Sequence, residues 1–384
     1  MKINLFLCLL TYLFKVCYNK IDYFMKEGRT MSRVEKLRSA MKNEGIDGFL
    51  ITSPYNLRYL TNFTGTTGLA VITLTNAYFV TDFRYTEQAA KQAQEYKIVK
   101  NTGPIFDEVA QLCQKDGIKS LGFEEAFVSF AQYGQLEELI KTSELVPISG
   151  MIEELREMKE NHEVDTVRKA CEIADKGIEH IWNTIKPGMT EIEVANQLDF
   201  YMRSLGATCV SFDTIVASGL RSAMPHGVAS EKVIEKGDLI TIDFGCYYDG
   251  YVSDETRTFA VGDPGQKLKD IYQIVLEANL KVIDAAKPGM SGIELDAIAR
   301  DHIASFGYGE AFGHSTGHGI GLEIHEGPNV SFRADKRFVP GNIITDEPGI
   351  YLPGIGGVRI EDDLLITSTG NEVLTKSSKE FMIL

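Results

Sequence analysis

An internal repeat in the second half of the chain constrains its fold more than any other feature. The segment KPGMT, which begins at Lys186, recurs as KPGMS from Lys287, and each copy lies between two helical patterns. GDLITIDFG aligns with GNIITDEPG, so Asp243 and Glu347 occupy equivalent positions, each after an apolar run typical of a strand. Such a repeat predicts two similar halves related by a pseudo-twofold axis, with the ends of equivalent strands meeting at one central site.

The repeat pairs acidic residues with acidic residues and one histidine with another. Asp254 has a counterpart in Glu361 once a small insertion is allowed, and PHGV, with His226, is echoed by GHGI, with His318. Any one of these acids alone would be interpreted as an exposed loop residue, as most Asp and Glu are. As a set, equivalent acids at strand ends favour a shared site.

Four carboxylates that converge in a largely apolar domain cannot all stay ionised without a cation, because buried like charges disfavour the charged form. Two divalent metal ions would remove this repulsion, and such a pair lowers the pKa of a shared water. An oxygen-rich ligand set with one histidine suits Mn²⁺, Co²⁺ or Zn²⁺, and the ligand set alone does not select among them.

Four of the seven histidines lie in short glycine-rich segments, namely His226, His314, His318 and His325. Glycine lets the backbone approach a ligand closely, which favours hydrogen-bonding or proton-transfer roles for these histidines beside a metal. The other three lie in charged helical patterns and are expected to face solvent: His162, His180 and His302.

The length of 384 residues predicts two domains with separate cores. Residues 1–30 contain an apolar run too short to span a bilayer and no small-residue cleavage site, so we expect a non-native or translated leader extension. In residues 31–150, Val34, Leu37 and Met41 have helical spacing, GFLIT is typical of a strand, and GLAVITLTNAYFVTD predicts two strands around a Thr-Asn turn. This alternation predicts an α/β domain, followed by a second domain over residues 151–384.

Charge and cysteine content exclude several classes of function. The formal net charge of −15 repels phosphate backbones and anionic lipid surfaces, so we expect neither nucleic acid nor a membrane as a partner. The six cysteines include no C-x-x-C pair, which argues against a disulfide framework and against a thiolate metal site. A cytoplasmic protein fits these features best.

Several motifs, all within residues 211–363, together resemble those of one enzyme family. They are PHGV, IDFGCYYDGYVSDETRTF, TGHGIGLEIHEGP, TDEPGIYLP and GGVRIEDD. They resemble the metallopeptidases of the prolidase and aminopeptidase P group, within the wider family of methionine aminopeptidase and creatinase, and the resemblance extends from about Met31 to the end. It implies an α/β creatinase-like N-terminal domain and an α+β "pita-bread" catalytic domain with an internal pseudo-twofold repeat and a dinuclear metal centre.

The resemblance also implies the metal ligands. Asp243 is expected to chelate one ion, Asp254 and Glu361 to bridge both ions, and His318 and Glu347 to bind the other. Glu347 is further expected to shuttle a proton to the leaving nitrogen.

Four more residues acquire roles from the resemblance. His226 and His325 are expected to hold substrate carbonyls and the tetrahedral intermediate, a stabilisation of the oxyanion-hole type. His314 is expected on the substrate side, and Arg359 is expected to support the bridging Glu361. Glu255, beside Asp254, stands where the family more usually has a hydrophobic residue, and we expect it to face solvent.

The sequences TDEPGIYLP and DFGCYY look most like those of bacterial Xaa-Pro aminopeptidases, which implies peptide substrates with proline in the second position. Prolidase, which cleaves Xaa-Pro dipeptides, shares the fold and ligands and remains an alternative. A non-catalytic binding module is a third, less favoured alternative, because all five ligands are intact. The resemblance further implies a homodimer or higher homo-oligomer.

Overall fold

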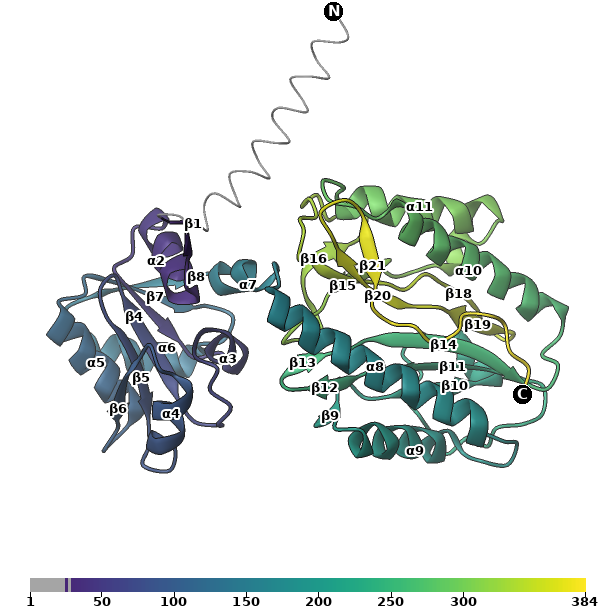
Figure 1. The fold of residues 1–384 in the computed structure, drawn as a ribbon, viewed down its shortest axis with the longest axis horizontal. Coiled ribbons are helices and arrows are strands. Elements are labelled where there is room, and N and C mark those ends of the chain that lie inside the picture. The colour runs from purple at the N-terminus through teal and green to yellow at the C-terminus, as the bar shows by residue number, and fades with distance from the viewer. Residues whose placement is uncertain (1–24, 27–28) are drawn as a thin grey trace, which may run out of the picture. The chain divides into compact units, whose positions relative to one another are not determined.

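A computed structural model describes residues 25–26 and 29–384 (Figure 1). The chain divides into two compact units after Arg156, and α7 (Met151–Arg156) lies between this division and the predicted one at residue 150. The predicted leader lies outside the described residues, apart from the short antiparallel pair β1 (Met25–Lys26) and β2 (Arg29–Thr30). Within the described part of the chain, no helix has the length and apolar character needed to cross a membrane.

The N-terminal unit is built on one mixed six-stranded sheet. In spatial order its strands are β6 (Lys97–Lys100), β5 (Ala77–Thr81), β4 (Leu69–Thr73), β3 (Gly48–Ile51), β7 (Ser120–Glu124) and β8 (Glu144–Ile148). The predicted hairpin is confirmed: β4 and β5 pair antiparallel, and the Asn76 N–H donates to the Thr73 Oγ1 at 2.8 Å in the turn between them.

Five helices accompany this sheet: α2 (Arg33–Asn43), α3 (Pro54–Thr61), α4 (Thr86–Gln92), α5 (Ile105–Asp116) and α6 (Phe130–Leu139). In α2, Val34, Leu37 and Met41 are all buried, as their spacing predicted. Ser32 caps this helix by accepting from the Glu35 N–H, and the Glu35 carboxylate accepts from the Ser32 N–H in return.

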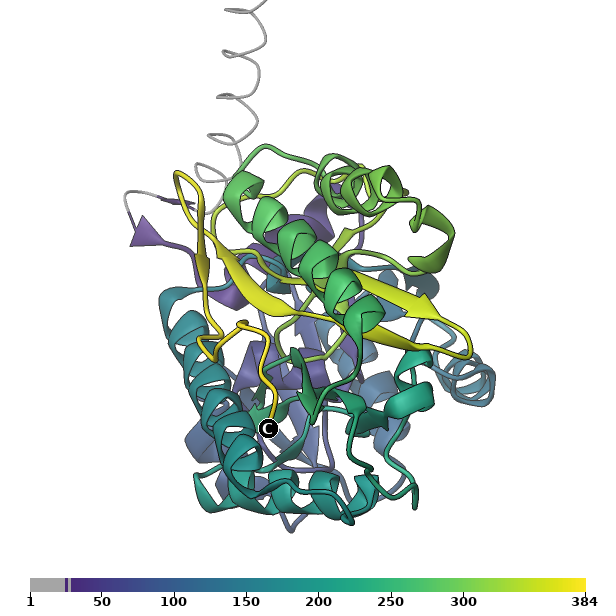
Figure 2. The same cartoon turned by 90° about the vertical axis from the view of Figure 1, so that its right-hand side faces the viewer.

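The C-terminal unit places its strands between two pairs of helices. Figures 1 and 2 show α8 (Asn161–Thr184) and α9 (Glu191–Ser204) on one side, with α10 (Gln266–Ala285) and α11 (Gly292–Ser305) on the other. The first half holds the sheet β10 (Ile215–Ser218), β11 (Asp238–Phe244), β14 (Glu255–Val261) and the sheet β13 (Tyr251–Val252), β12 (Cys246–Tyr248), β9 (Cys209–Val210). The second half holds the sheet β16 (Glu326–Val330), β15 (Gly317–Gly319), β17 (Ile343–Asp346), β20 (Asp362–Ile366), β21 (Asn371–Val373) and the pair β18 (Gly349–Leu352), β19 (Gly356–Arg359).

The structure confirms the internal repeat in detail. Thr190 and Ser291 are the N-caps of α9 and α11, and each side chain accepts from the N–H three residues later. Gly188 and Gly289 precede them with φ of 97° and 89°, values that favour glycine. Each half has its own apolar core between its helices and its sheet.

Candidate metal centre

The five predicted metal ligands lie on strands or at strand ends contributed by both halves of the C-terminal unit. Asp243 is the next-to-last residue of β11, and Asp254 immediately precedes β14. His318 is the central residue of β15, Glu347 directly follows β17, and Glu361 lies between β19 and β20. The repeat therefore brings equivalent positions together, as the sequence predicted.

The side chains of three predicted ligands converge closely. One ligand atom from each of Asp254, His318 and Glu361 lies within 4.8 Å of the others. The His318 Nε2 is 3.6 Å from the Asp254 Oδ2 and 3.6 Å from the Glu347 Oε1. Because the His318 Nδ1 lies 3.1 Å from the Gly319 carbonyl oxygen, a proton on Nδ1 leaves the Nε2 lone pair facing these carboxylates.

Only one of the two carboxylate oxygens of Asp243 has a hydrogen-bond partner among the described residues. Its Oδ2 accepts from the Arg359 Nη2 at 2.6 Å. Its Oδ1 is buried and has no hydrogen-bond partner among the described residues. A buried carboxylate oxygen without a partner is costly, and a metal ion would satisfy it.

The electrostatics of the cluster also favour a cation. Burial, followed by the negative charges of neighbouring acids, raises the pKa of Asp254 and of Glu361 well above their ordinary values. Burial and the charge of Asp243 raise the pKa of Glu347 to about 8, although Arg359 opposes this shift. Burial and the nearby His325 lower the pKa of His318 to about 4. A neutral imidazole among carboxyl groups that resist ionisation fits divalent metal ions, whose charge would offset the repulsion.

Arg359 supports the cluster through two routes. It is 3% exposed and bonds Asp243 directly. Its Nε also donates to the Thr256 Oγ1 at 3.1 Å, and that hydroxyl donates to the Glu361 Oε2 at 2.6 Å. Among the proposed ligands, Arg359 thus hydrogen-bonds Asp243 directly and is linked to the predicted partner Glu361 by hydrogen bonds through Thr256.

His314 lies beside Glu347. Its Nδ1 is 3.9 Å from the Glu347 Oε2, and its Nε2 lies 2.8 Å from the Tyr351 hydroxyl, which also accepts from the Arg359 Nη1 at 2.8 Å. Burial and the charge of Arg359 lower the pKa of His314 to about 4, which keeps its ring neutral.

The two other predicted substrate histidines are exposed. The ring of His325 lies 4.4 Å from the ring of His318, between centroids. His226 lies in the loop after η1 (Gly219–Ala223), near enough for its charge to contribute to the lowered pKa of His314. Exposed imidazoles near a buried polar cluster are placed to contact a bound molecule.

Two expectations about exposure were wrong. Glu255 is fully buried, because residues on β14 alternate between two covered faces and its carboxylate meets Arg257 and Ser377. His302 is only 8% exposed, since α11 packs on α10, where the His302 Nδ1 lies 2.7 Å from the Lys281 Nζ. The expectation holds for His162, which is exposed.

Three residues of the site were missed by the sequence reasoning: Thr256, Tyr351 and Arg257. Thr256 follows Asp254 by two positions and therefore shares its face of the strand, a periodicity that could have identified it. The contacts of Tyr351 and Arg257 are with residues on other strands or loops, and no local sequence pattern predicts such tertiary contacts.

Comparisons with known proteins identify the family of this chain. Residues 165–368 match the family described as metallopeptidase family M24, and residues 33–158 match the creatinase/prolidase N-terminal domain. The chain is 43% identical over 356 residues to a protein of Pyrococcus horikoshii named Xaa-Pro dipeptidase, covering 91% of this chain and 98% of that one.

Two solved structures have the same fold over nearly their whole length. A Bacillus anthracis structure described as an Xaa-Pro dipeptidase superimposes with a TM-score of 0.91 at 56% identity, covering 92% of this chain and 99% of that one. A Thermotoga maritima structure described as an X-Pro aminopeptidase gives a TM-score of 0.85 at 38% identity, covering 90% of this chain and 100% of that one. The chain therefore belongs to metallopeptidase family M24, with a creatinase-like N-terminal domain before a pita-bread catalytic domain.

Proposed function

We propose that this metallopeptidase hydrolyses the bond between an N-terminal residue and a following proline, with Xaa-Pro dipeptides as its preferred substrates. The observation that carries the proposal is the convergence of Asp254, His318 and Glu361 within 4.8 Å of one another in a member of family M24. Preference for dipeptides is supported by the relatives at 43% and 56% identity, both named as Xaa-Pro dipeptidases.

An Xaa-Pro aminopeptidase is the second candidate, and it is the one that the sequence motifs favoured. It is supported by the Thermotoga maritima relative at 38% identity, which is described as an X-Pro aminopeptidase. The two activities differ in whether the site accepts a chain that continues beyond proline. A homodimer or larger homo-oligomer and a cytoplasmic location stay predictions.

The proposed ligand set divides between two divalent metal ions, of which Mn²⁺ is the expected kind. Asp243 would hold one ion, His318 and Glu347 the other, and Asp254 and Glu361 both. When bound, the ions would polarise the scissile carbonyl and lower the pKa of a water molecule.

The protein's own groups would position the substrate and move the proton. Glu347 lies between His318 and His314, and a carboxyl group in this position can pass a proton to the leaving proline nitrogen. The exposed imidazoles of His226 and His325 would donate hydrogen bonds to the substrate carbonyls. Through its bond to Asp243, Arg359 would hold that carboxylate in its orientation.

The test compares an Xaa-Pro dipeptide with the matching Xaa-Pro-Yaa tripeptide and an Xaa-Ala dipeptide, using the purified chain loaded with Mn²⁺. We expect chelator-sensitive cleavage of the Xaa-Pro dipeptide in preference to both others. Preference for the tripeptide would establish the aminopeptidase instead, and preference for Xaa-Ala would refute proline specificity. Asp254→Asn serves as the control for contaminating peptidases.

A further inference from the structure

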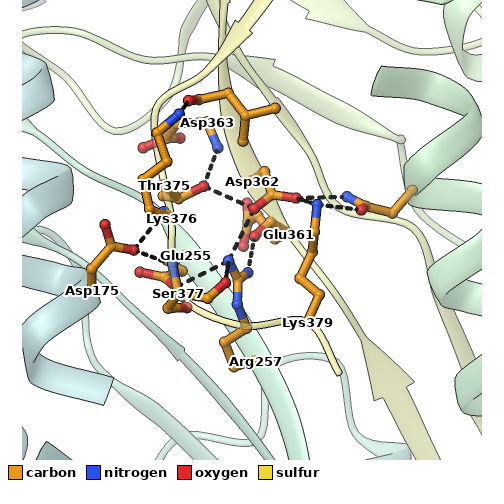
Figure 3. Close-up of polar contacts among 12 residues, drawn as sticks. Asp175, Glu255, Arg257, Glu361, Asp362, Asp363, Thr375, Lys376, Ser377 and Lys379 are labelled. Carbon is orange, nitrogen blue, oxygen red and sulfur yellow. Dashed lines mark hydrogen bonds and ion pairs between the residues drawn. The ribbon is translucent and has the colours of Figure 1, made fainter. Parts of the chain in front are cut away.

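A buried cluster of charged residues includes the sequence neighbours of the two proposed bridging acids, and Figure 3 shows Glu255, Arg257 and Asp362 near Glu361. Asp254, just before β14, and Thr256 face the metal centre, whereas Glu255 and Arg257 point to the opposite face, as strand alternation requires. Arg257 is 1% exposed and Glu255 is 0% exposed. A fully buried guanidinium must have several partners, so its contacts indicate what it holds together.

Arg257 joins the two halves of the catalytic unit at the main chain. Its Nη1 donates to the carbonyl oxygen of Thr256 at 3.0 Å and to that of Glu361 at 2.5 Å. Thr256 belongs to the sheet of the first half, whereas Glu361 directly precedes β20 in the sheet of the second half. The same two residues are joined by the Glu361 N–H, which donates to the Thr256 carbonyl at 3.2 Å.

The second terminal nitrogen of the guanidinium group, Nη2, contacts two carboxylates and the C-terminal segment. The Nη2 lies 3.0 Å from the Asp362 Oδ1 and 3.2 Å from the Glu255 Oε1, and it donates to the Ser377 carbonyl at 3.1 Å. The Ser377 hydroxyl in turn donates to Glu255. The two carboxylates that meet the Arg257 Nη2 therefore belong to the residues next to the bridging acids in sequence.

Residues 375–384, which we call the C-terminal strap, close this cluster. The Lys379 Nζ lies 2.5 Å from the Asp362 Oδ2, and the main-chain N–H groups of Lys376 and Ser377 each donate to the Asp175 Oδ1 at 2.7 Å. Beyond them, the Ala260 N–H donates to the Met382 carbonyl at 3.0 Å, so the strap runs along β14 itself. Figure 3 shows Thr375, Ser377 and Lys379 gathered around Asp362 and Arg257.

We propose that Arg257 is a positioning residue that sets the distance between the carboxylates of Asp254 and Glu361, and that Glu255 and the C-terminal strap hold Arg257 in place. One bridging acid comes from each half of the unit, so their separation depends on how the halves are joined. The inference rests on the metal centre proposed above, and it assigns to Glu255 the role of a buried partner that holds the Arg257 side chain.

The test measures Co²⁺ binding to the full metal-free chain by calorimetry and by the visible absorption of the bound ion, which reports its coordination geometry. Arg257→Lys keeps the charge but removes the fork, whose Nη1 reaches the two carbonyls while its Nη2 meets the two carboxylates. It should weaken Co²⁺ binding by about 10–100-fold and change the spectrum. The matched control is Arg168→Lys, in the partly exposed pair with Glu372 in the same unit, which should bind Co²⁺ as the wild type does.

Glu255→Gln provides a second variant if Arg257→Lys does not fold, because it keeps the shape of the side chain and changes only the carboxyl group that faces the Arg257 Nη2. It should weaken Co²⁺ binding by about tenfold. If Arg257→Lys folds, wild-type Co²⁺ affinity and spectrum in that variant would overturn the proposal. If Arg257→Lys does not fold, the same result in Glu255→Gln would overturn it.

The same titration separates this inference from the proposed function. A wild-type chain that binds Co²⁺ but cleaves no Xaa-Pro peptide would refute the substrate proposal, and the comparison of variants would still decide the role of Arg257. A wild-type chain that binds no Co²⁺ would overturn both.

Discussion

We expect the metal-free catalytic unit to lose stability as the pH rises from about 5.5 to about 7.5. The reason lies in Glu347, whose pKa is raised by burial from an ordinary 4.5 to about 8 in the folded protein. The folded state then holds a proton that the unfolded state has released. This stabilisation is complete below the unfolded pKa and is lost as the pH rises toward the folded one.

The size of this loss of stability follows from the one proton that Glu347 retains in the folded state. Each such proton changes the free energy of unfolding by about 1.4 kcal/mol per pH unit, so Glu347 alone accounts for a loss of about 3 kcal/mol over about two units. Asp254 and Glu361 have pKa values raised in the same direction and add to the loss. Bound Mn²⁺ would hold these carboxylates ionised, so the stabilisation by metal should grow with pH.

The assay is urea denaturation followed by tryptophan fluorescence. Trp182 is the single tryptophan of the chain, and it lies on α8 with its ring 6.5 Å from that of Phe259 on β14, between centroids. Its emission therefore reports unfolding of the catalytic unit. The metal-free chain and its Glu347→Gln variant are compared across the pH range, because glutamine cannot release a proton. A stability difference between the two that does not change with pH would refute the reasoning.

Three further predictions concern single substitutions in and around the site. Asp254→Asn or Glu361→Gln should abolish hydrolysis while circular dichroism stays that of the wild type, and near wild-type turnover in either metal-loaded variant would contradict the bridging roles. Thr256→Val removes the hydroxyl that donates to Glu361 at 2.6 Å, so it should destabilise the catalytic unit by about 1–3 kcal/mol and weaken Mn²⁺ binding. Thr256→Ser keeps the hydroxyl and should restore both stability and Mn²⁺ binding. Equal behaviour of the two variants in urea denaturation and in metal titration would count against this contact. Gly245→Ala would place a Cβ 1.9 Å from the Ser253 carbonyl oxygen and should lower the free energy of unfolding by about 1–3 kcal/mol or more. Gly134→Ala in α6, where a Cβ meets nothing within 4 Å, should raise the free energy of unfolding by about 0.5–1 kcal/mol. Calorimetry that shows a Gly245→Ala protein as stable as the wild type would contradict the packing described.

The parts of the fold that were predicted correctly are those determined by local residue spacing or by the internal repeat. The spacing of Val34, Leu37 and Met41 predicted α2, and the recurrence of KPGM predicted a helix after each copy, as α9 and α11 are. The alignment of Asp243 with Glu347 placed two acids at equivalent strand ends, which the structure brings to one cluster. These features depend on residues close together in the chain or on a copied pattern, so sequence alone carries them.

The misses have a common physical cause. Glu255 looked like a solvent-exposed acid because strand alternation tells which face a side chain takes but not what covers that face. The covering element is the C-terminal strap, more than a hundred residues away, which supplies Ser377 beside Glu255. Likewise, Arg359 reaches Glu361 through Thr256, a contact between separate strands that no spacing reveals. Tertiary contacts of this kind decide burial and are invisible to local periodicity.

Anomalous X-ray diffraction from crystals of the Mn²⁺-loaded chain would test the proposed centre most directly. The account predicts two anomalous peaks roughly 3.5–4 Å apart, both within coordination distance of Asp254 and Glu361, with Asp243 beside one and His318 and Glu347 beside the other. A single peak in the Mn²⁺-saturated crystal, or two peaks that share neither Asp254 nor Glu361, would contradict it.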